Sequence, residues 1–239
     1  MMINHVYHGD CLEVMPQFPD KSIDMILCDL PYGTTQNKWD SVIPLNQLWM
    51  QYERIIKDNG VIVLTAQTPF DKVLGYSNLN LLKYEWIWEK PQGTGHLNAK
   101  KMPMKNHENI LVFYKNLPTY NPQMTKGEPY QQKSGRGSSN YNKQHSVLTV
   151  NDGERYPLTV QRFNYDKKKL HPTQKPVTLF EYLIRTYTNE GDLVLDNCIG
   201  SGTTAVARIN TKRNFIGIEI EEKYYKITLE RISKTPKPF

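Results

Sequence analysis

The chain has 239 residues, of which 38% are apolar and 23% are charged, and its formal net charge is +6. These proportions exclude a collagen-like repeat and a fully disordered chain, and the length favours one α/β domain with an insertion. The apolar runs have the length of strands, which excludes a membrane protein. The three cysteines form no CxxC pair, so we predict neither a zinc site nor a disulfide framework.

Strand and helix patterns alternate over the first 115 residues. Residues 22–28 form a short apolar strand pattern that ends at Asp29-Leu30-Pro31-Tyr32-Gly33, where Pro and Gly favour a turn. Apolar residues at helical spacing predict a helix over 45–56, with its end at Asn59-Gly60. Further strands are expected at 60–66, 84–88 and 109–114, and a loop at 91–106.

The positive charge is concentrated in the middle of the chain. Residues 90–170 contain 14 Lys and Arg against 5 Asp and Glu, whereas residues 1–89 have a net charge of −5. The same segment is rich in Asn, Gln and Tyr. Lys and Arg contact phosphates, while Asn, Gln and Arg read base edges, so this composition favours nucleic-acid binding. A solvated surface insertion is the alternative.

The last third of the chain has a sharper pattern. A helix is predicted from Pro176 to Gly191, and a strand at 193–195 leads to Asp196 and the turn Gly200-Ser201-Gly202-Thr203-Thr204. A helix then runs to about Asn210. A strand at 215–218 ends at Glu219, and a final helix is expected over 221–233.

The glycine turn and Glu219 together indicate a nucleotide-binding unit. Small residues let the backbone approach a ligand closely, the helix N-terminus attracts negative charge, and a carboxylate after the second strand can bind a ribose diol. Gly200 and Gly202 fit the dinucleotide template, with Glu219 lying 17 residues past Gly202. A nicotinamide-dependent oxidoreductase is therefore one alternative, and a tight turn without a ligand is another.

The position of this unit near the end of the sequence sets the expected topology. Few residues follow Glu219, so the remaining strands of the sheet must come from residues 1–115. We therefore expect an α/β fold with a Rossmann-like, doubly wound and mostly parallel sheet in circularly permuted order, with an inserted region. Ligands bind at the carboxyl ends of such strands, so the glycine turn and Asp29–Tyr32 should meet across one crevice.

The Asp29-Leu30-Pro31-Tyr32 motif has the groups that a flipped nucleobase with an exocyclic amine requires. It supplies a carboxylate, a backbone carbonyl before a rigid Pro, and an aromatic ring. Two acceptors can hold the amine hydrogens and the ring can stack on the base. A capped turn with a core Tyr is the alternative for four residues alone.

The order and spacing of these motifs resemble the amino-methylating DNA methyltransferases of the β class. In that family an Asp-Pro-Pro-Tyr motif comes first, a target-recognition region lies mid-chain, and the Phe-x-Gly-x-Gly cofactor motif comes last. Residues 7–12 resemble the opening segment of the family, and His171-Pro172-Thr173-Gln174-Lys175-Pro176 resembles the segment before the final unit. The resemblance implies S-adenosylmethionine as cofactor.

The resemblance also assigns roles to individual residues. Asp29, Leu30, Pro31 and Tyr32 are the catalytic motif. Asp10 is expected to meet the cofactor adenine, Lys175 to lie near its methionine part and Glu219 to bind the ribose. The full expected cofactor set is Asp10, Cys11, Lys175, Asp196, Gly200, Ser201, Gly202, Thr203 and Glu219.

Two positions depart from the family pattern. Leu30 replaces the usual first Pro, but its expected role is that of a backbone carbonyl, so activity should survive. Asn197-Cys198-Ile199 replaces the usual Pro-Phe-x, which leaves looser support for the flipped base and more room for a purine. No Cys follows a Pro, so the resemblance gives no support to cytosine-C5 methylation.

The resemblance divides the chain into a catalytic half (1–115), a target-recognition insertion (116–170) and a cofactor-binding half (171–239). Double-stranded DNA is the expected partner, a homodimer is compatible with the family, and neither a metal nor a membrane is expected. The expected location is the cytoplasm of a bacterium, with a bacterial or phage gene, near the nucleoid. The candidate DNA contacts are Lys100, Lys101, Arg136, Lys143, Arg162, Lys167, Lys168 and Lys169.

The predicted reaction is methyl transfer from S-adenosylmethionine to adenine N6 in DNA, with base flipping. An Asp at the first motif position goes mainly with adenine in the family, whereas Ser goes mainly with cytosine N4. N4-cytosine methylation is the nearest alternative, and the same chemistry on RNA or on a protein glutamine is a further one. A catalytically inactive nucleic-acid-binding module is disfavoured, because the catalytic and cofactor motifs are both present.

Overall fold

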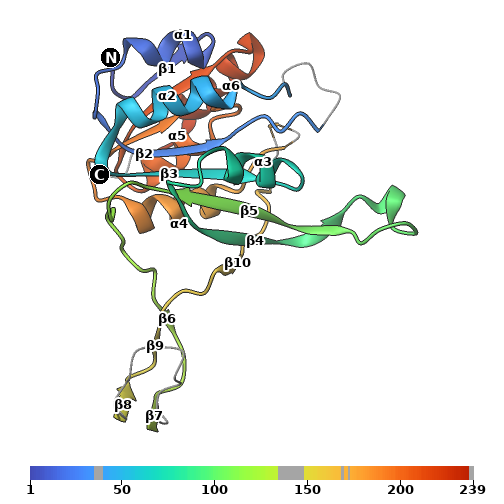
Figure 1. The fold of residues 1–239 in the computed structure, drawn as a ribbon, viewed down its shortest axis with the longest axis vertical. Coiled ribbons are helices and arrows are strands. Elements are labelled where there is room, and N and C mark those ends of the chain that lie inside the picture. Colours follow the sequence, from blue (N-terminus) through green and yellow to red (C-terminus); the bar gives the residue numbers. More distant parts are fainter. Residues whose placement is uncertain (35–39, 134–147, 168–169, 172, 237–239) are drawn as a thin grey trace. The chain divides into compact units, whose positions relative to one another are not determined.

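The computed structural model describes residues 1–34, 40–133, 148–167, 170–171 and 173–236 (Figure 1). The chain forms two compact units, one made of Met1–Asn121 and Thr159–Phe239, and one made of Pro122–Leu158. The second unit lies within the segment 116–170 that the sequence marks as an insertion. Residues 159–170 at the end of that segment belong to the first unit.

The first unit is built on an eight-stranded sheet in the order β1-β12-β11-β2-β3-β5-β4-β10. The first five strands in this order run parallel, β5 is antiparallel to both of its neighbours, and β10 is parallel to β4. The predicted mostly parallel α/β sheet is thus confirmed. The strands are β1 (His5–His8), β2 (Ile23–Asp29), β3 (Ile56–Ala66), β4 (Leu82–Thr94), β5 (Lys105–Phe113), β10 (Val160–Arg162), β11 (Leu193–Asp196) and β12 (Asn214–Glu219).

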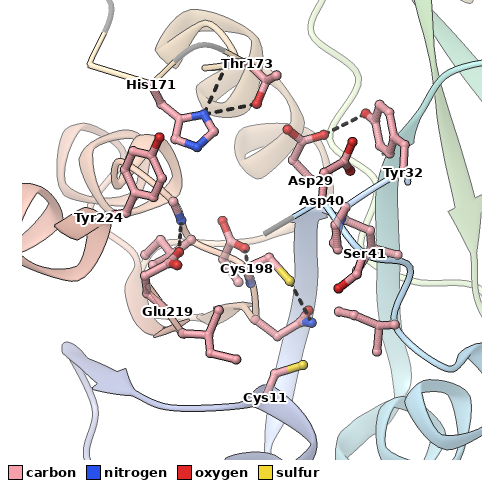
Figure 2. A pocket seen from close by; sticks show the side chains of 18 of the residues that line it. Cys11, Asp29, Tyr32, Asp40, Ser41, His171, Thr173, Cys198, Glu219 and Tyr224 are labelled. Carbon is pink, nitrogen blue, oxygen red and sulfur yellow. Dashed lines mark hydrogen bonds between the residues drawn. The ribbon is translucent and has the colours of Figure 1, made fainter. Parts of the chain in front are cut away.

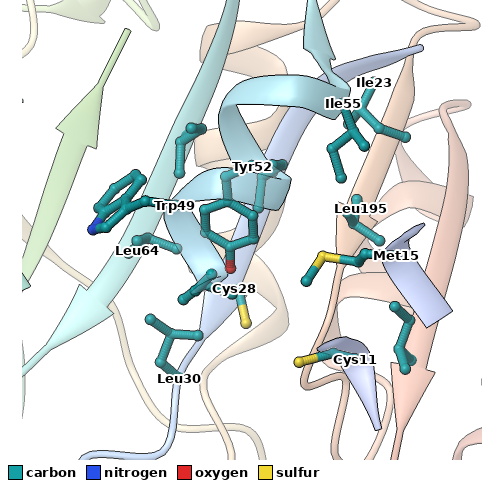
Figure 3. Packing of buried hydrophobic residues seen from close by; sticks show 14 of the residues in the cluster. Cys11, Met15, Ile23, Cys28, Leu30, Trp49, Tyr52, Ile55, Leu64 and Leu195 are labelled. Carbon is teal, nitrogen blue, oxygen red and sulfur yellow. The ribbon is translucent and has the colours of Figure 1, made fainter. Parts of the chain in front are cut away.

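Helices cover both faces of this sheet because side chains alternate along its buried strands. In β2, Cys28 lies in one cluster with Tyr52 of α2 (Figure 3), and Ile26 belongs to the same cluster. Met25 and Leu27 belong to the cluster that contains α4. Among the described residues, no helix combines the length and the apolarity that crossing a membrane requires. The helices are α1 (Cys11–Val14), α2 (Leu45–Ile55), α3 (Phe70–Ser77), α4 (Val177–Tyr187), α5 (Thr203–Asn210) and α6 (Glu222–Lys234), with short 3-10 turns η1 (Met15–Gln17) and η2 (His96–Asn98).

Several element boundaries differ from the sequence prediction, including the end of α4, which lies at Tyr187 and not at Gly191. The helix end at Asn59-Gly60 is wrong, because α2 ends at Ile55 and β3 begins at Ile56. A Cβ on Gly60 would lie 2.9 Å from the Asp24 carbonyl oxygen, so this glycine permits close strand approach and does not end a helix. The predicted loop 91–106 is also partly strand, because β4 continues to Thr94 and β5 starts at Lys105.

The second unit consists of two short antiparallel pairs. Strand β6 (Thr125–Lys126) pairs with β9 (Glu154–Arg155), and β7 (Tyr130–Lys133) pairs with β8 (Leu148–Asn151). The Arg155 guanidinium lies 4.7 Å from the centre of the Tyr130 ring. This unit has few large apolar side chains. Hydrogen bonds between its paired strands, and local contacts such as that of Arg155 with Tyr130, therefore hold its strands together.

Candidate active site

Four acidic residues meet at one edge of the sheet. Because β1, β2, β11 and β12 are parallel, their carboxyl ends bring together Asp10, Asp29, Asp196 and Glu219. A cavity of about 270 Å³ lies at this edge (Figure 2). Of the residues assigned from the sequence, those that line it are Asp10, Cys11, Asp29, Leu30, Pro31, Tyr32, Lys175, Asp196, Gly200, Ser201, Thr203 and Glu219.

The Asp29 carboxylate is held by three donors. Its Oδ1 accepts hydrogen bonds from the hydroxyls of Tyr32 (2.7 Å) and Thr65 (2.5 Å). Its Oδ2 lies 2.6 Å from Nζ of Lys175. A carboxylate has about four lone-pair sites, so Oδ2 retains the capacity to accept one further donor from the cavity. The carboxylate is therefore fixed in orientation and still able to bind a ligand hydrogen.

The remainder of the motif is fixed by packing and by backbone contacts. The Tyr32 ring stacks on Phe70, with ring centres 5.4 Å apart. Burial raises the pKa of Tyr32 well above its ordinary value, and Asp29 adds to the shift, so Tyr32 is a neutral donor. After the motif, the Asp40 carboxylate accepts hydrogen bonds from the backbone N–H groups of Gly33 (2.9 Å) and Thr34 (3.0 Å).

Behind Asp29 lies a buried cluster of charges that the sequence analysis missed. Lys175 Nζ lies 3.2 Å from Oε2 of Glu108 as well as 2.6 Å from Asp29, and Oε1 of Glu108 lies 2.6 Å from Nζ of Lys90. Burial lowers the pKa of Lys175, but Asp29 and Glu108 outweigh it and raise that pKa above its ordinary value. Burial likewise raises the pKa of Glu108, but Lys175 and Lys90 reverse the shift and lower it. Both shifts favour the charged forms of Lys175 and Glu108.

The cofactor half of the cavity is formed by two buried acids. Glu219 accepts backbone hydrogen bonds from Gly200 (2.7 Å) and Glu221 (2.9 Å), and burial raises its pKa. Asp196 accepts a hydrogen bond from the backbone N–H of Cys198 (3.1 Å) and another from the Thr204 hydroxyl. Burial raises the pKa of Asp196 to about 7. These contacts tie the glycine turn to the ends of β11 and β12.

The glycines of the turn have different roles. Gly200 (φ +54°) lines the cavity, whereas Gly202 (φ +83°) is outside its described lining. A Cβ on Gly202 would lie 3.0 Å from the Thr228 methyl group, so Gly202 permits the close approach of α6. On the opposite side, Asp10 caps α1 by accepting a hydrogen bond from the Leu12 backbone N–H (2.8 Å).

Residues beyond the sequence assignments also contribute to the cavity wall. The His171 ring lies 4.2 Å from the Tyr224 ring, and His171 Nδ1 accepts a hydrogen bond from the backbone N–H of Thr173 (3.2 Å). All three residues line the cavity (Figure 2). His171 and Thr173 lie in the segment 171–176 noted in the sequence, whereas no local signal marks Tyr224.

The candidate DNA contacts that the structure describes are not among the residues that line the cavity. Lys100 and Lys101 are exposed in the turn that joins β4 to β5, and Arg162 and Lys167 are also exposed. Arg136, Lys143, Lys168 and Lys169 fall outside the described residues. No group of three His, Cys, Asp or Glu side chains in the described part of the chain is arranged to hold a metal ion.

Comparisons with known proteins agree with this geometry. A family model described as DNA methylase matches residues 23–230. The type II methyltransferase M.BglII of Bacillus subtilis is 29% identical, over 98% of this chain and 70% of that protein. The DNA adenine methyltransferase YhdJ of Escherichia coli (strain K12) is also 29% identical, over 95% of this chain and 82% of that protein.

Solved structures show the same fold. The M1.HpyAVI-SAM complex is 26% identical with a TM-score of 0.67, covering 95% of this chain and 98% of that chain. The PvuII DNA methyltransferase (cytosine-N4-specific) has a TM-score of 0.71 at 17% identity, covering 95% of this chain and 85% of that one. The second similarity establishes the architecture only.

Proposed function

Because the chain belongs to the DNA methylase family, we propose that it transfers the methyl group of S-adenosylmethionine to the N6 amine of adenine in DNA. The observation that carries the proposal is the cavity shared by Asp29–Tyr32 and by the unit that runs from Asp196 to Glu219. One half offers acceptors for an amine, and the other half offers a carboxylate and a glycine turn for a nucleoside.

The cofactor half fits an amphipathic nucleoside ligand. Each oxygen of Glu219 already accepts one backbone N–H group, which fixes the carboxylate and leaves a lone pair on each oxygen for the hydroxyls of a ribose. Ile199 and Ile220 add apolar lining on the same side. S-adenosylmethionine, when bound there, supplies an electrophilic methyl group.

The motif residues would orient the target amine. The lone pair of an aromatic amine is delocalised into the ring, so the amine is a weak nucleophile. Asp29 Oδ2 and the Leu30 carbonyl oxygen would accept its two hydrogens, which favours a pyramidal nitrogen whose lone pair is free to attack. Tyr32, held by Phe70, would stack on the base. The methylated nitrogen is cationic and therefore acidic, and Asp29 or water takes its proton. Positioning and electrostatics would provide most of the rate.

Adenine is favoured over cytosine as the target by three observations. The relative YhdJ is named a DNA adenine methyltransferase, and the first motif position here is an Asp, as it mainly is in adenine-methylating members of the family. Cys198, which lines the cavity, is also smaller than the Phe usual in the family and leaves room for a purine.

Access to the amine requires that the base leave the duplex, because the amine of a stacked and paired base cannot reach the cavity. We propose that exposed basic side chains contact the phosphates flanking the flipped base. Lys100, Lys101, Arg162 and Lys167 are the described candidates. Arg136, Lys143, Lys168 and Lys169 remain candidates from the sequence.

Labelled methyl transfer and product analysis test the proposal together. Purified protein is incubated with tritium-labelled S-adenosylmethionine and DNA from a strain that lacks its own methylases, and the digested nucleosides are analysed by mass spectrometry. N6-methyladenine is the expected product. N4-methylcytosine as the main product would overturn the choice of base, and label in neither nucleoside would overturn the proposed reaction. Single-molecule sequencing of the same DNA would then give the recognition sequence.

A further inference from the structure

Lys90 and Glu108 have no role in the reaction proposed above. Their side chains are nevertheless ionisable and almost completely buried beside the Asp29–Lys175 pair. We propose that Glu108 is a positioning residue that shares the Lys175 ammonium with Asp29, and thereby lets Asp29 Oδ2 accept a hydrogen of the target amine. This inference rests on the proposed methyl transfer and adds a residue from a different strand to it.

The geometry joins four charges from four parts of the chain. Asp29 ends β2, Lys90 is in β4, Glu108 is in β5, and Lys175 precedes α4. The side chains of Lys90, Lys175 and Glu108 are 6%, 5% and 11% exposed. Two ammonium groups therefore face two carboxylates in a site with little water, and the cluster has no net charge.

Lys175 and a target amine would both donate to Asp29 Oδ2, so a strong hydrogen bond from Lys175 weakens the one that the amine can make. The 2.6 Å contact of Lys175 with Asp29 Oδ2 is a charge-assisted hydrogen bond, and such a bond is stronger than one donated by a neutral amine. A buried ammonium does not leave its partner unless another anion receives it. Glu108 Oε2, at 3.2 Å from the same nitrogen, is that second anion.

Lys90 completes the arrangement from the other side of Glu108. Its ammonium lies 2.6 Å from Oε1 and leaves Oε2 at an ion-pair distance of 3.2 Å from Lys175, with no hydrogen bond of its own. Lys175 can thus shift towards Glu108 while its ammonium stays paired, and Asp29 keeps the hydroxyl donors Tyr32 and Thr65. Without the carboxylate of Glu108, Lys175 would be confined to Asp29, and Oδ2 would be less able to accept the amine hydrogen.

The test compares two variants that break the same Lys90–Glu108 ion pair from opposite ends. Glu108→Gln removes the alternative partner of Lys175 and should lower kcat by about tenfold or more, since the missing interaction acts on the bound amine. Lys90→Gln leaves that partner in place and should lower kcat by a clearly smaller factor. Glu222→Gln, which breaks an exposed ion pair with Lys226, is the matched control and should leave kcat unchanged.

Other measurements separate positioning from structure. Affinity for S-adenosylhomocysteine should stay within about twofold of wild type in Glu108→Gln, because the change lies outside the cofactor half. Equal losses of kcat in Glu108→Gln and Lys90→Gln, or parallel losses of kcat and cofactor affinity, would overturn the inference. If Glu108→Gln does not fold, Glu108→Asp is the substitute variant, because it keeps the carboxylate but places it one methylene farther from Lys175. It should lower kcat and retain cofactor affinity. An unchanged kcat in Glu108→Asp would contradict the inference.

A spectroscopic measurement distinguishes failure of this inference from failure of the proposed function. Proton–nitrogen NMR of lysine ammonium groups should show a slowly exchanging Lys175 signal, identified by its loss in Lys175→Met. The signal should shift in Glu108→Gln even if no DNA is methylated by the wild type. A Lys175 signal that is unaffected by Glu108→Gln would overturn the sharing of Lys175, whatever the outcome of the methylation assay.

Discussion

Asp29 binds no part of the cofactor in the arrangement proposed here, because its carboxylate faces Tyr32, Thr65 and Lys175. Asp29→Ala should therefore abolish methyl transfer and leave affinity for S-adenosylmethionine within a few-fold of wild type. Calorimetric titration and a radiolabel assay measure the two effects, with Asp20→Ala at an exposed position as control. Loss of cofactor binding in a folded Asp29→Ala protein would contradict the assignment.

Glu219 should show the opposite behaviour. Its carboxylate organises the Gly200 turn and is the proposed ribose acceptor, so Glu219→Ala should weaken cofactor binding by about 1–3 kcal/mol, the cost of removing a buried hydrogen-bond partner. The measurement is the same titration, together with kcat at saturating cofactor. An unchanged dissociation constant for S-adenosylmethionine in Glu219→Ala would contradict the assignment of Glu219 as the ribose acceptor.

The raised pKa of Asp196 makes a prediction about stability. Burial raises it from 3.8 to about 7, so the folded protein binds this proton more tightly than the unfolded chain does. The contribution of protonated Asp196 to the free energy of unfolding is complete below pH 3.8 and is lost as the pH rises towards 7. Urea unfolding across this range should show a falling free energy of unfolding, and Asp196→Asn should flatten part of the fall. An equal slope in both proteins would show that other groups cause it.

Which site residues were predictable depended on whether their role is local. Asp29–Tyr32 and the Gly200 turn each form a short motif after a strand, so their position could be read from consecutive residues. Lys175 was expected from the sequence in the cofactor half, but its ion pair with Asp29 spans 146 positions. Glu108 and Lys90 come from strands whose ends were predicted as a loop. A cluster of ion pairs from four parts of the chain leaves no pattern in the local sequence, because tertiary packing decides which charged side chains are buried together.

At the scale of elements, the turn between β4 and β5 is the clearest candidate for contact with phosphates. Lys100 and Lys101 are exposed there. If both bind phosphates, Lys100→Gln with Lys101→Gln should reduce the slope of log affinity against log salt by about 0.9 for each phosphate that is no longer neutralised. Fluorescence anisotropy at several salt concentrations measures the slope, and Lys226→Gln on α6 is the control. An unchanged slope would show that Lys100 and Lys101 are solvated side chains that do not neutralise phosphates.

The long helices were predictable, and short elements were predictable only beside a motif. Helices α2 and α4 follow strong apolar periodicity, and the sequence located them to within a few residues. Strands β11 and β12 are short, but the glycine turn and Glu219 mark their ends. Strand β1 and helix α1 are each four residues long, so neither has enough residues for a period to appear. Gly60 misled the prediction because a glycine that ends a helix and one that permits close strand packing look alike in sequence.

At the scale of the molecule, the separation into two units predicts separable functions. Residues Pro122–Leu158 form a unit of their own and contribute nothing to the described cavity lining. Replacing them by a flexible linker of about ten Gly and Ser residues should leave cofactor affinity intact and weaken DNA binding. Calorimetry and anisotropy on the shortened protein test this. Normal sequence-specific methylation by that protein would exclude the unit from target recognition.

The order of the strands also has a consequence for synthesis on the ribosome. Strand β1 lies at the edge of the sheet beside β12, with His5 paired to Ile216, and β2 pairs with β11. The earliest strand to emerge must therefore wait for the latest, because β12 and β11, which lie between β1 and β2, come from the last part of the chain. A nascent polypeptide cannot complete the nucleoside site before translation reaches β12, so a protein interrupted upstream has no assembled centre with which to modify the genome.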